Sequence, residues 1–127
     1  MNRLELADKY LNDANVLYTH NTQYELMSIC CFNCIKYLLL ELLSKNNIDL
    51  KSVKNLTTLV RNCNIVDLND YLDYFRLLQE IKDNQEPNDD YCEILDYNLA
   101  SIIMAKMYKV SSIIKNKLNA KEEFNYE

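Results

Sequence analysis

The absence of glycine constrains the fold of this chain more than any other feature of its sequence. The 127 residues include no glycine, and Pro87 is the single proline. Tight β-hairpins usually need glycine at turn positions with positive φ, so a glycine-free chain favours helices joined by asparagine-rich connections. Hydrophobic residues make up 49% of the chain, which is enough for one core of ordinary domain size. The sequence therefore predicts a single all-α domain.

Hydrophobic residues recur at three- and four-residue steps in five segments, which is the spacing of amphipathic helices. We expect four of these helices at residues 4–19, 23–45, 68–82 and 89–118. A shorter one, third in the chain, follows Ser52 and carries Val53, Leu56, Leu59 and Val60. His20-Asn21-Thr22 predicts a turn in which Asn21 or Thr22 caps the second helix. Asn46-Asn47 is expected to end that helix in the left-handed conformation, and Ser52 to cap the third. Short connections between such helices predict an up-and-down bundle of four or five helices over residues 1–118, with a polar tail at 119–127.

The second expected helix is apolar around most of its circumference. In its central part the polar interruptions are Ser28, Asn33, Lys36 and Glu41. A helix with this pattern is either the central helix of its own bundle or is buried against another chain. The last helix also has an apolar face wider than one core needs. We therefore expect a two-fold homodimer, the commonest soluble oligomer, with a single shared core as the alternative. The expected contact residues are Leu40, Leu43, Ile103, Met107 and their neighbours.

Charge and cysteine content bear on the partners and the location of the chain. The formal net charge is −5, which disfavours general nucleic-acid binding. Charged residues such as Arg3 and Asp8 interrupt the first ten positions, so no signal peptide is expected there. The longest apolar run, residues 37–43, contains Glu41 and is too short to span a bilayer. Five cysteines without an export signal indicate reduced thiols and a cytoplasmic protein.

The middle of the chain carries a family-like pattern. Residues 42–48 read Leu-Leu-Ser-Lys-Asn-Asn-Ile, a leucine-rich helix end with its turn, and Val53-Lys54-Asn55-Leu56 opens the next helix. Over residues 4–63 the chain resembles the HEPN domain, in which these positions hold a Leu-rich run with Lys-His-Gly-Ile and a Thr-His-Asp-Leu. Lys36 replaces the family's helix-two Glu, Lys54 replaces its His, and the usual Arg-Tyr-Pro before the last helix is missing. The resemblance implies a dimeric helical bundle in a toxin–antitoxin, nucleotidyltransferase-associated or defence system.

HEPN ribonucleases use an Arg separated by four to six residues from a His, and this pair positions and protonates the RNA phosphodiester. The single histidine here is His20, and the positions at the required spacing hold Asp13, Ala14 and Asn15. No catalytic residue is therefore expected, and the leading interpretation is a non-catalytic binding and dimerisation module. Its candidate ligand-binding residues are Lys36, Lys54 and Arg61.

Two other interpretations stay open at this point. One is a divergent ribonuclease toxin that uses Lys54, Arg61 and an acidic cluster at Glu86, Asp89, Asp90 and Glu93. The other is a small inhibitor that occupies a partner's surface. The acidic cluster is also what a helix N-terminus attracts through its dipole, and we favour that explanation.

Three cysteines on the second helix invite comparison with a metal site. Cys31-x-x-Cys34 has the spacing of half a zinc site, with Cys30 beside it. No second Cys/His pair at such spacing exists in the chain, and free cysteine is among the most buried residue types. We therefore expect these thiols to pack in the core, with no metal and no cofactor.

Overall fold

The computed structural model describes residues 1–46, 55–84 and 95–124, and every regular element in these ranges is helical. The elements are α1 (Arg3–Thr19), α2 (Tyr24–Lys45), α3 (Leu56–Cys63), the 3-10 helix η1 (Val66–Tyr71), α4 (Leu72–Asp83) and α6 (Tyr97–Phe124). This confirms the expected all-α class. The expectations for Asn47, Ser52, Lys54 and the acidic cluster fall outside the described residues.

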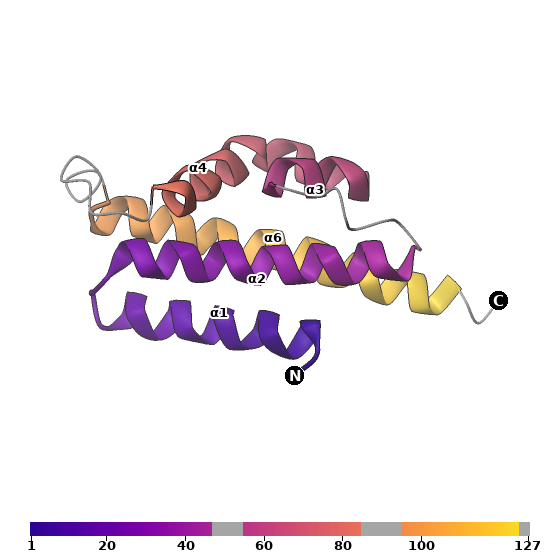
Figure 1. The fold of residues 1–127 in the computed structure, drawn as a ribbon, viewed down its shortest axis with the longest axis horizontal. Coiled ribbons are helices and arrows are strands. Elements are labelled where there is room, and N and C mark those ends of the chain that lie inside the picture. The colour runs from indigo at the N-terminus through magenta and orange to yellow at the C-terminus, as the bar shows by residue number, and fades with distance from the viewer. Residues whose placement is uncertain (47–54, 85–94, 125–127) are drawn as a thin grey trace.

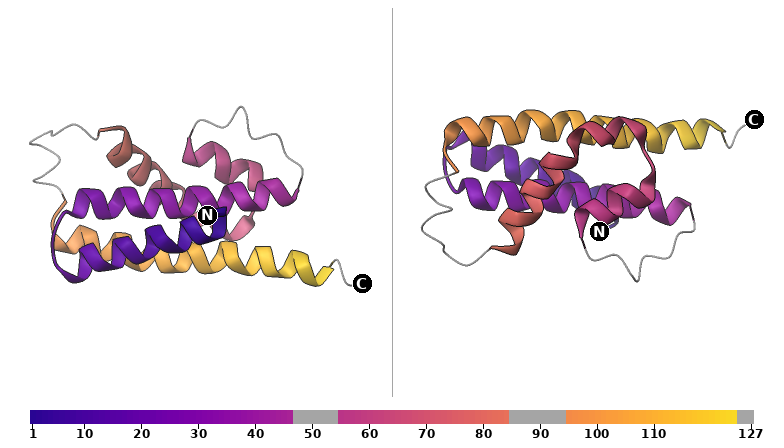
Figure 2. Two further views of the ribbon diagram at one scale, coloured as in Figure 1. Left: turned by 60° about the horizontal axis from the view of Figure 1, so that its bottom comes forward. Right: turned by 90° about the horizontal axis from the view of Figure 1, so that it is seen from above.

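Helix α2 lies at the centre of the bundle. It packs against α1, α3, α4 and α6. Figure 1 shows α1 antiparallel to α2 along one side and α6 parallel to α2 behind it. The shorter α3 and α4 lie across the remaining side, and α4 crosses the long helices obliquely (Figure 2, right). The broad apolar circumference of α2 is therefore mostly satisfied inside one chain, as in the single-core alternative.

The burial of individual side chains corrects the expected dimer contact. Leu43 of α2 and Ile103 and Met107 of α6 have no exposed surface, because they belong to the core of a single chain. A second copy cannot reach them while the bundle is folded. Leu40, the fourth expected contact residue, is only partly buried. Any dimer that keeps the bundle intact must therefore use residues other than Leu43, Ile103 and Met107.

Polar contacts hold the outer helices against one another. The Tyr74 hydroxyl of α4 donates to the Ile103 carbonyl oxygen of α6 at 2.9 Å, and Tyr74 is buried. Between α1 and α6, the hydroxyls of Tyr18 and Ser101 lie 2.7 Å apart, and Lys115 pairs with Asp8 at 3.3 Å. These bonds fix α1 and α4 relative to α6.

Asparagine and glutamine take over the positions that glycine usually occupies. In the connection between α1 and α2, Asn21 and Gln23 have φ of 52° and 48°, the left-handed region. Gln23 precedes α2 without a side-chain cap, so the expected cap at Asn21 or Thr22 is wrong. Asn46 has φ of −95° and is not left-handed, and Asn47, the other residue of the expected cap, lies outside the described residues. A left-handed helix end occurs at Asn64, after α3.

The later helices differ from their expected bounds. The expected fourth helix is divided, because η1 ends at Tyr71 and α4 begins at Leu72. Asp96 accepts a hydrogen bond from the Leu99 amide at 2.9 Å and so caps α6 directly before Tyr97. At its other end α6 continues to Phe124, six residues beyond the expected end at 118. Most of the expected polar tail is therefore helical.

The length of α2 also bears on membrane insertion. The 22-residue helix is long and apolar enough to cross a membrane by length and composition alone, which the short run at 37–43 did not indicate. In the structure, however, 61% of its most apolar window is buried inside the bundle. This is the pattern of a core helix.

Candidate binding site

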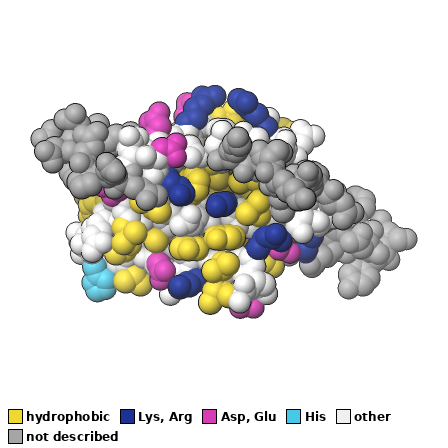
Figure 3. Space-filling view, in the orientation of Figure 1, with side chains coloured by type: hydrophobic (Ala, Val, Ile, Leu, Met, Phe, Trp, Pro, Cys, Tyr) yellow, Lys and Arg dark blue, Asp and Glu magenta, His cyan; other side chains and the backbone are white. Residues whose placement is uncertain are grey.

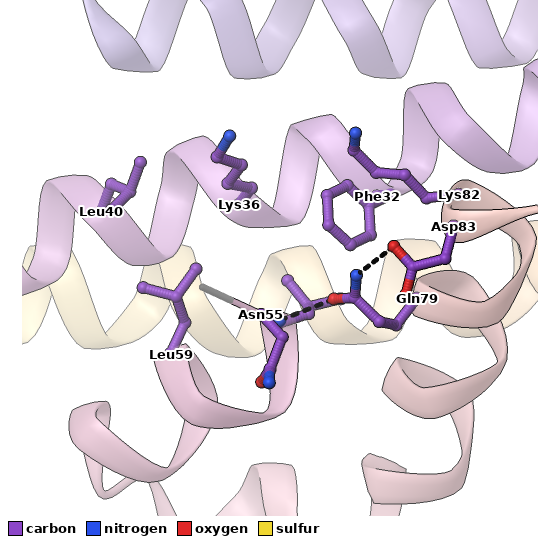
Figure 4. Close-up of a pocket in the computed structure, with 9 residues that line it drawn as sticks. Phe32, Lys36, Leu40, Asn55, Leu59, Gln79, Lys82 and Asp83 are labelled. Atoms are coloured by element: carbon purple, nitrogen blue, oxygen red, sulfur yellow. Dashed lines mark hydrogen bonds between the residues drawn. The ribbon is translucent and has the colours of Figure 1, made fainter. Parts of the chain in front are cut away.

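A pocket of about 200 Å³ opens where α2, α3 and α4 meet (Figure 4). Three residues from or next to each helix line it: Phe32, Lys36 and Leu40 of α2; Asn55, Leu56 and Leu59 at α3; and Gln79, Lys82 and Asp83 of α4. Leucines and the phenylalanine ring form its apolar part, and the charged and amide groups stand around them. The pocket therefore offers both apolar surface and charge.

The spacing of residues along α2 explains its contribution to the pocket. Phe32, Lys36 and Leu40 follow one another at four-residue steps, which places them in line on one side of the helix. That side faces the gap between the start of α3 and the end of α4 (Figure 4). Phe32 is almost fully buried, while Lys36 and Leu40 are only partly so.

The wall between α3 and α4 is held by hydrogen bonds. Asn55 caps α3 by accepting from the Thr58 amide at 2.8 Å. The Leu56 amide donates to Gln79 Oε1 at 2.9 Å, and Gln79 Nε2 donates to Asp83 Oδ1 at 3.0 Å. Gln79 thus satisfies a free amide of the first turn of α3 from a different helix. These groups shape the pocket and are largely engaged with one another.

The two lysines of the pocket stand over aromatic rings. Lys82 Nζ lies 5.2 Å from the centre of the Phe32 ring, and Lys36 Nζ lies 5.9 Å from that of Tyr37. Both distances allow a cation–π interaction. Within the described residues neither lysine has an ion pair. Figure 3 shows basic side chains set among apolar ones on this face. With Asp83, the pocket carries a formal charge of about +1 on a chain of net charge −5.

The structure separates the three candidate residues named from the sequence. Lys36 lines the pocket. Arg61 is exposed on α3 and is not among the pocket residues, and Lys54 lies outside the described residues. Sequence reasoning missed Lys82 and Gln79, because α2 and α4 approach each other only in the folded chain. The four-residue spacing of Phe32, Lys36 and Leu40 was the sequence feature that could have indicated the α2 side of the pocket.

The cysteines of α2 are core residues. Cys31 has no exposed surface, and its Sγ lies 3.6 Å from Met104 Sδ. Burial raises the pKa of the Cys34 thiol to about 12 and that of Cys63 to about 11, and it raises the pKa of Cys31 further still. Thiols with such pKa values stay protonated at neutral pH and pack as small apolar groups. Within the described ranges, no three His, Cys, Asp or Glu side chains lie together as metal ligands would.

Two other polar regions of the described residues are weaker candidates for a binding site than the pocket at α2, α3 and α4. His20 is exposed in the connection between α1 and α2. A second pocket of about 200 Å³ lies between the start of α1 and the end of α6. There Lys115 already pairs with Asp8 at 3.3 Å, so its charges are engaged within the chain.

No protein-family model, curated protein or solved structure matches this chain.

Proposed function

We propose that this chain is a non-catalytic helical binding module of the HEPN type, which holds a protein partner on the face formed by α2, α3 and α4. The observation that carries the proposal is the pocket, where apolar side chains meet Lys36 and Lys82. An apolar centre with charged groups around it is typical of protein contact sites. Pockets for whole small ligands usually measure about 300–1,000 Å³. The volume of about 200 Å³ suits a single side chain of a partner better.

The HEPN part of the proposal rests on the sequence resemblance over residues 4–63. The bundle contains a first helix, a long apolar second helix and a short third helix, an order that many helical bundles share. Because the chain lacks the Arg/His pair, binding is the favoured role. The proposed setting is cytoplasmic, in a toxin–antitoxin, nucleotidyltransferase-associated or defence system. If the chain is instead a small inhibitor, it would bind its partner through the same face, and the binding would block the partner's activity.

The divergent ribonuclease is the second candidate. It would rely on Lys54, Arg61 and the acidic cluster. Arg61 is exposed and apart from the pocket, and no described carboxylate or histidine is hydrogen-bonded or paired to it. No observation among the described residues favours this candidate over the binding module.

Self-association, which the sequence predicted, needs a different surface from the one expected. Large apolar side chains are exposed on both sides of the seam between α1 and α6, where these helices lie side by side (Figure 2, left). Tyr97 stacks on Tyr18, and Tyr108 bonds to Asn15, next to Val16. Val16, Tyr97 and Tyr108 are each about half exposed, at 48%, 55% and 48%. We propose that a homodimer forms across this seam and leaves the pocket face free.

Site-specific photo-crosslinking in the native cell tests the binding module. A photoreactive benzoylphenylalanine replaces Lys36 or Lys82 at the pocket, or Ser112, an exposed control residue on α6. We expect one defined crosslinked product from both pocket positions and none from the control. Equal products at all three positions, or none at the pocket, would remove the proposal.

A further inference from the structure

We infer that the partner presents an amphipathic helix whose apolar face carries acidic residues, and that this helix lies along α2. The inference rests on the proposed function and gives the chemistry of the partner. Its evidence is the shape of the exposed side of α2, the volume of the pocket and the charge around it.

A row of incompletely buried side chains runs along one side of α2. The α2 row consists of Leu26, Ile29, Asn33, Lys36 and Leu40, at three- and four-residue steps. Leu26 is 45% exposed, and the others are partly buried. At about 1.5 Å per residue, the 14 steps from 26 to 40 span roughly 21 Å, or about four helical turns. Three of its five residues are apolar, so the row gives a partner helix apolar surface to lie along.

The pocket supplies a place for one anchoring side chain of that helix. It lies beside the second half of the α2 row, between Phe32, Leu40 and Leu59. Its volume of about 200 Å³ admits one aliphatic or aromatic side chain. Interface energy is concentrated in such buried anchors near the centre of a contact.

The charge around the anchor selects acidic neighbours. A helix laid over Lys36 and Lys82 would remove both ammonium groups from water. No described carboxylate pairs with either lysine, and Asp83 accepts from Gln79 instead. Desolvated charges without partners are costly, and carboxylates on the docked helix would compensate both ammonium groups. RNA would supply anions too, but its backbone does not match an apolar row on a chain of net charge −5.

Synthetic helices test this chemistry directly. Three peptides share one apolar Leu/Ala face and carry Glu, Gln or Lys at the interspersed positions. Each is titrated into the full ¹⁵N-labelled chain, and the amide shifts are followed by NMR. We expect the Glu peptide to shift amides around Phe32, Lys36 and Lys82, and to bind on the order of tenfold more tightly than the Lys peptide.

Charge reversal supplies the matched control. The pair Lys36→Glu and Lys82→Glu should reverse the preference, so that the Lys peptide now binds more tightly. The pair Lys106→Glu and Lys109→Glu makes the same change in net charge on exposed positions of α6 and should leave the preference unchanged. A reversal confined to the pocket pair assigns the selectivity to these two lysines.

Four results would overturn the inference: equal binding of the three peptides, shifts outside the pocket face, the same shifts with acetate alone, or the same shifts on concentrating the chain by itself. Shifts with acetate alone would indicate a small-anion site, and shifts on concentrating the chain would indicate that a second copy occupies this face. If crosslinks form at positions 36 and 82 but the Glu peptide binds no more tightly than the others, the binding module is retained and only the acidic partner helix is excluded. Absence of those crosslinks would remove the module itself.

Discussion

Alkaline pH should destabilise the folded chain through its buried thiols, and Cys34 allows the effect to be calculated. Cys34 is 1% exposed, and desolvation raises its pKa from 9.0 to about 12. A group whose pKa is raised by folding contributes full stability below the unfolded pKa. This stability is lost as pH rises from the unfolded towards the folded value. The window for Cys34 is therefore about pH 9 to 12.

The magnitude follows from the fraction ionised. At pH 10, one unit above the unfolded pKa, the thiol is about 90% ionised in the unfolded chain and almost fully protonated in the folded chain. Unfolding is then favoured by RT ln 11, or about 1.4 kcal/mol, relative to neutral pH. The change is a large part of the roughly 5–15 kcal/mol by which domains are stable.

Urea unfolding of the reduced protein at pH 7 and pH 10 measures the effect. The wild type should lose about 1.4 kcal/mol more between these pH values than Cys34→Ala does, because other titrating groups contribute equally to both. Ser28→Ala is the control: Ser28 is also buried on α2 and bonds to the Tyr24 carbonyl, but it does not titrate. Equal losses for wild type and Cys34→Ala would refute the reasoning. The thiol would then reach water, and chemistry at Cys31-x-x-Cys34 would again be open.

Four further outcomes are expected. Tyr74→Phe should lower the free energy of unfolding by about 1 kcal/mol, because it removes the hydrogen bond to the Ile103 carbonyl oxygen. The control Tyr10→Phe keeps the ring stacked on Tyr37 and should change this free energy by less than about 0.5 kcal/mol. Similar urea unfolding curves for the two variants would contradict this expectation. Purified protein should leave single-stranded RNA intact, and cleavage that disappears in Arg61→Ala would favour the ribonuclease. Elemental analysis should find well under one zinc or iron per chain, and about one, lost in Cys31→Ser, would contradict the packing of the thiols. Light scattering should give twice the chain mass of 15.1 kDa, reduced to that mass by Val16→Glu, and a monomer at every dilution would exclude the dimer.

Local signals in the sequence were sufficient for the positions of the first two helices and insufficient for the residues that cap the helices. The apolar periodicity of α1 and α2 placed both within one residue at each end. Caps depend on which backbone amides remain free once the chain has folded. Leu56 takes its acceptor from Gln79, 23 residues away, and a sequence window around α3 does not contain that information.

The expected dimer contact shows a second limit of sequence reasoning. Counting apolar positions around α2 gave the correct conclusion that the helix is covered on most sides. It could not tell whether the covering surface belongs to the same chain. Leu43, Ile103 and Met107 are covered by the helices of their own bundle, in which α2 packs against α1, α3, α4 and α6.

The polar residues that interrupt the apolar surface of α2 differ in what they contact: some hold the bundle together, and Lys36 faces the pocket. Ser28 is buried and donates to the Tyr24 carbonyl at 2.8 Å, and Glu41 pairs with Arg3 of α1 at 3.8 Å. Both therefore serve the bundle. Lys36 has only the Tyr37 ring as a described partner, and it stands in the α2 row at the edge of the pocket. Its position beside a cavity of side-chain size is the strongest reason to look for the partner there.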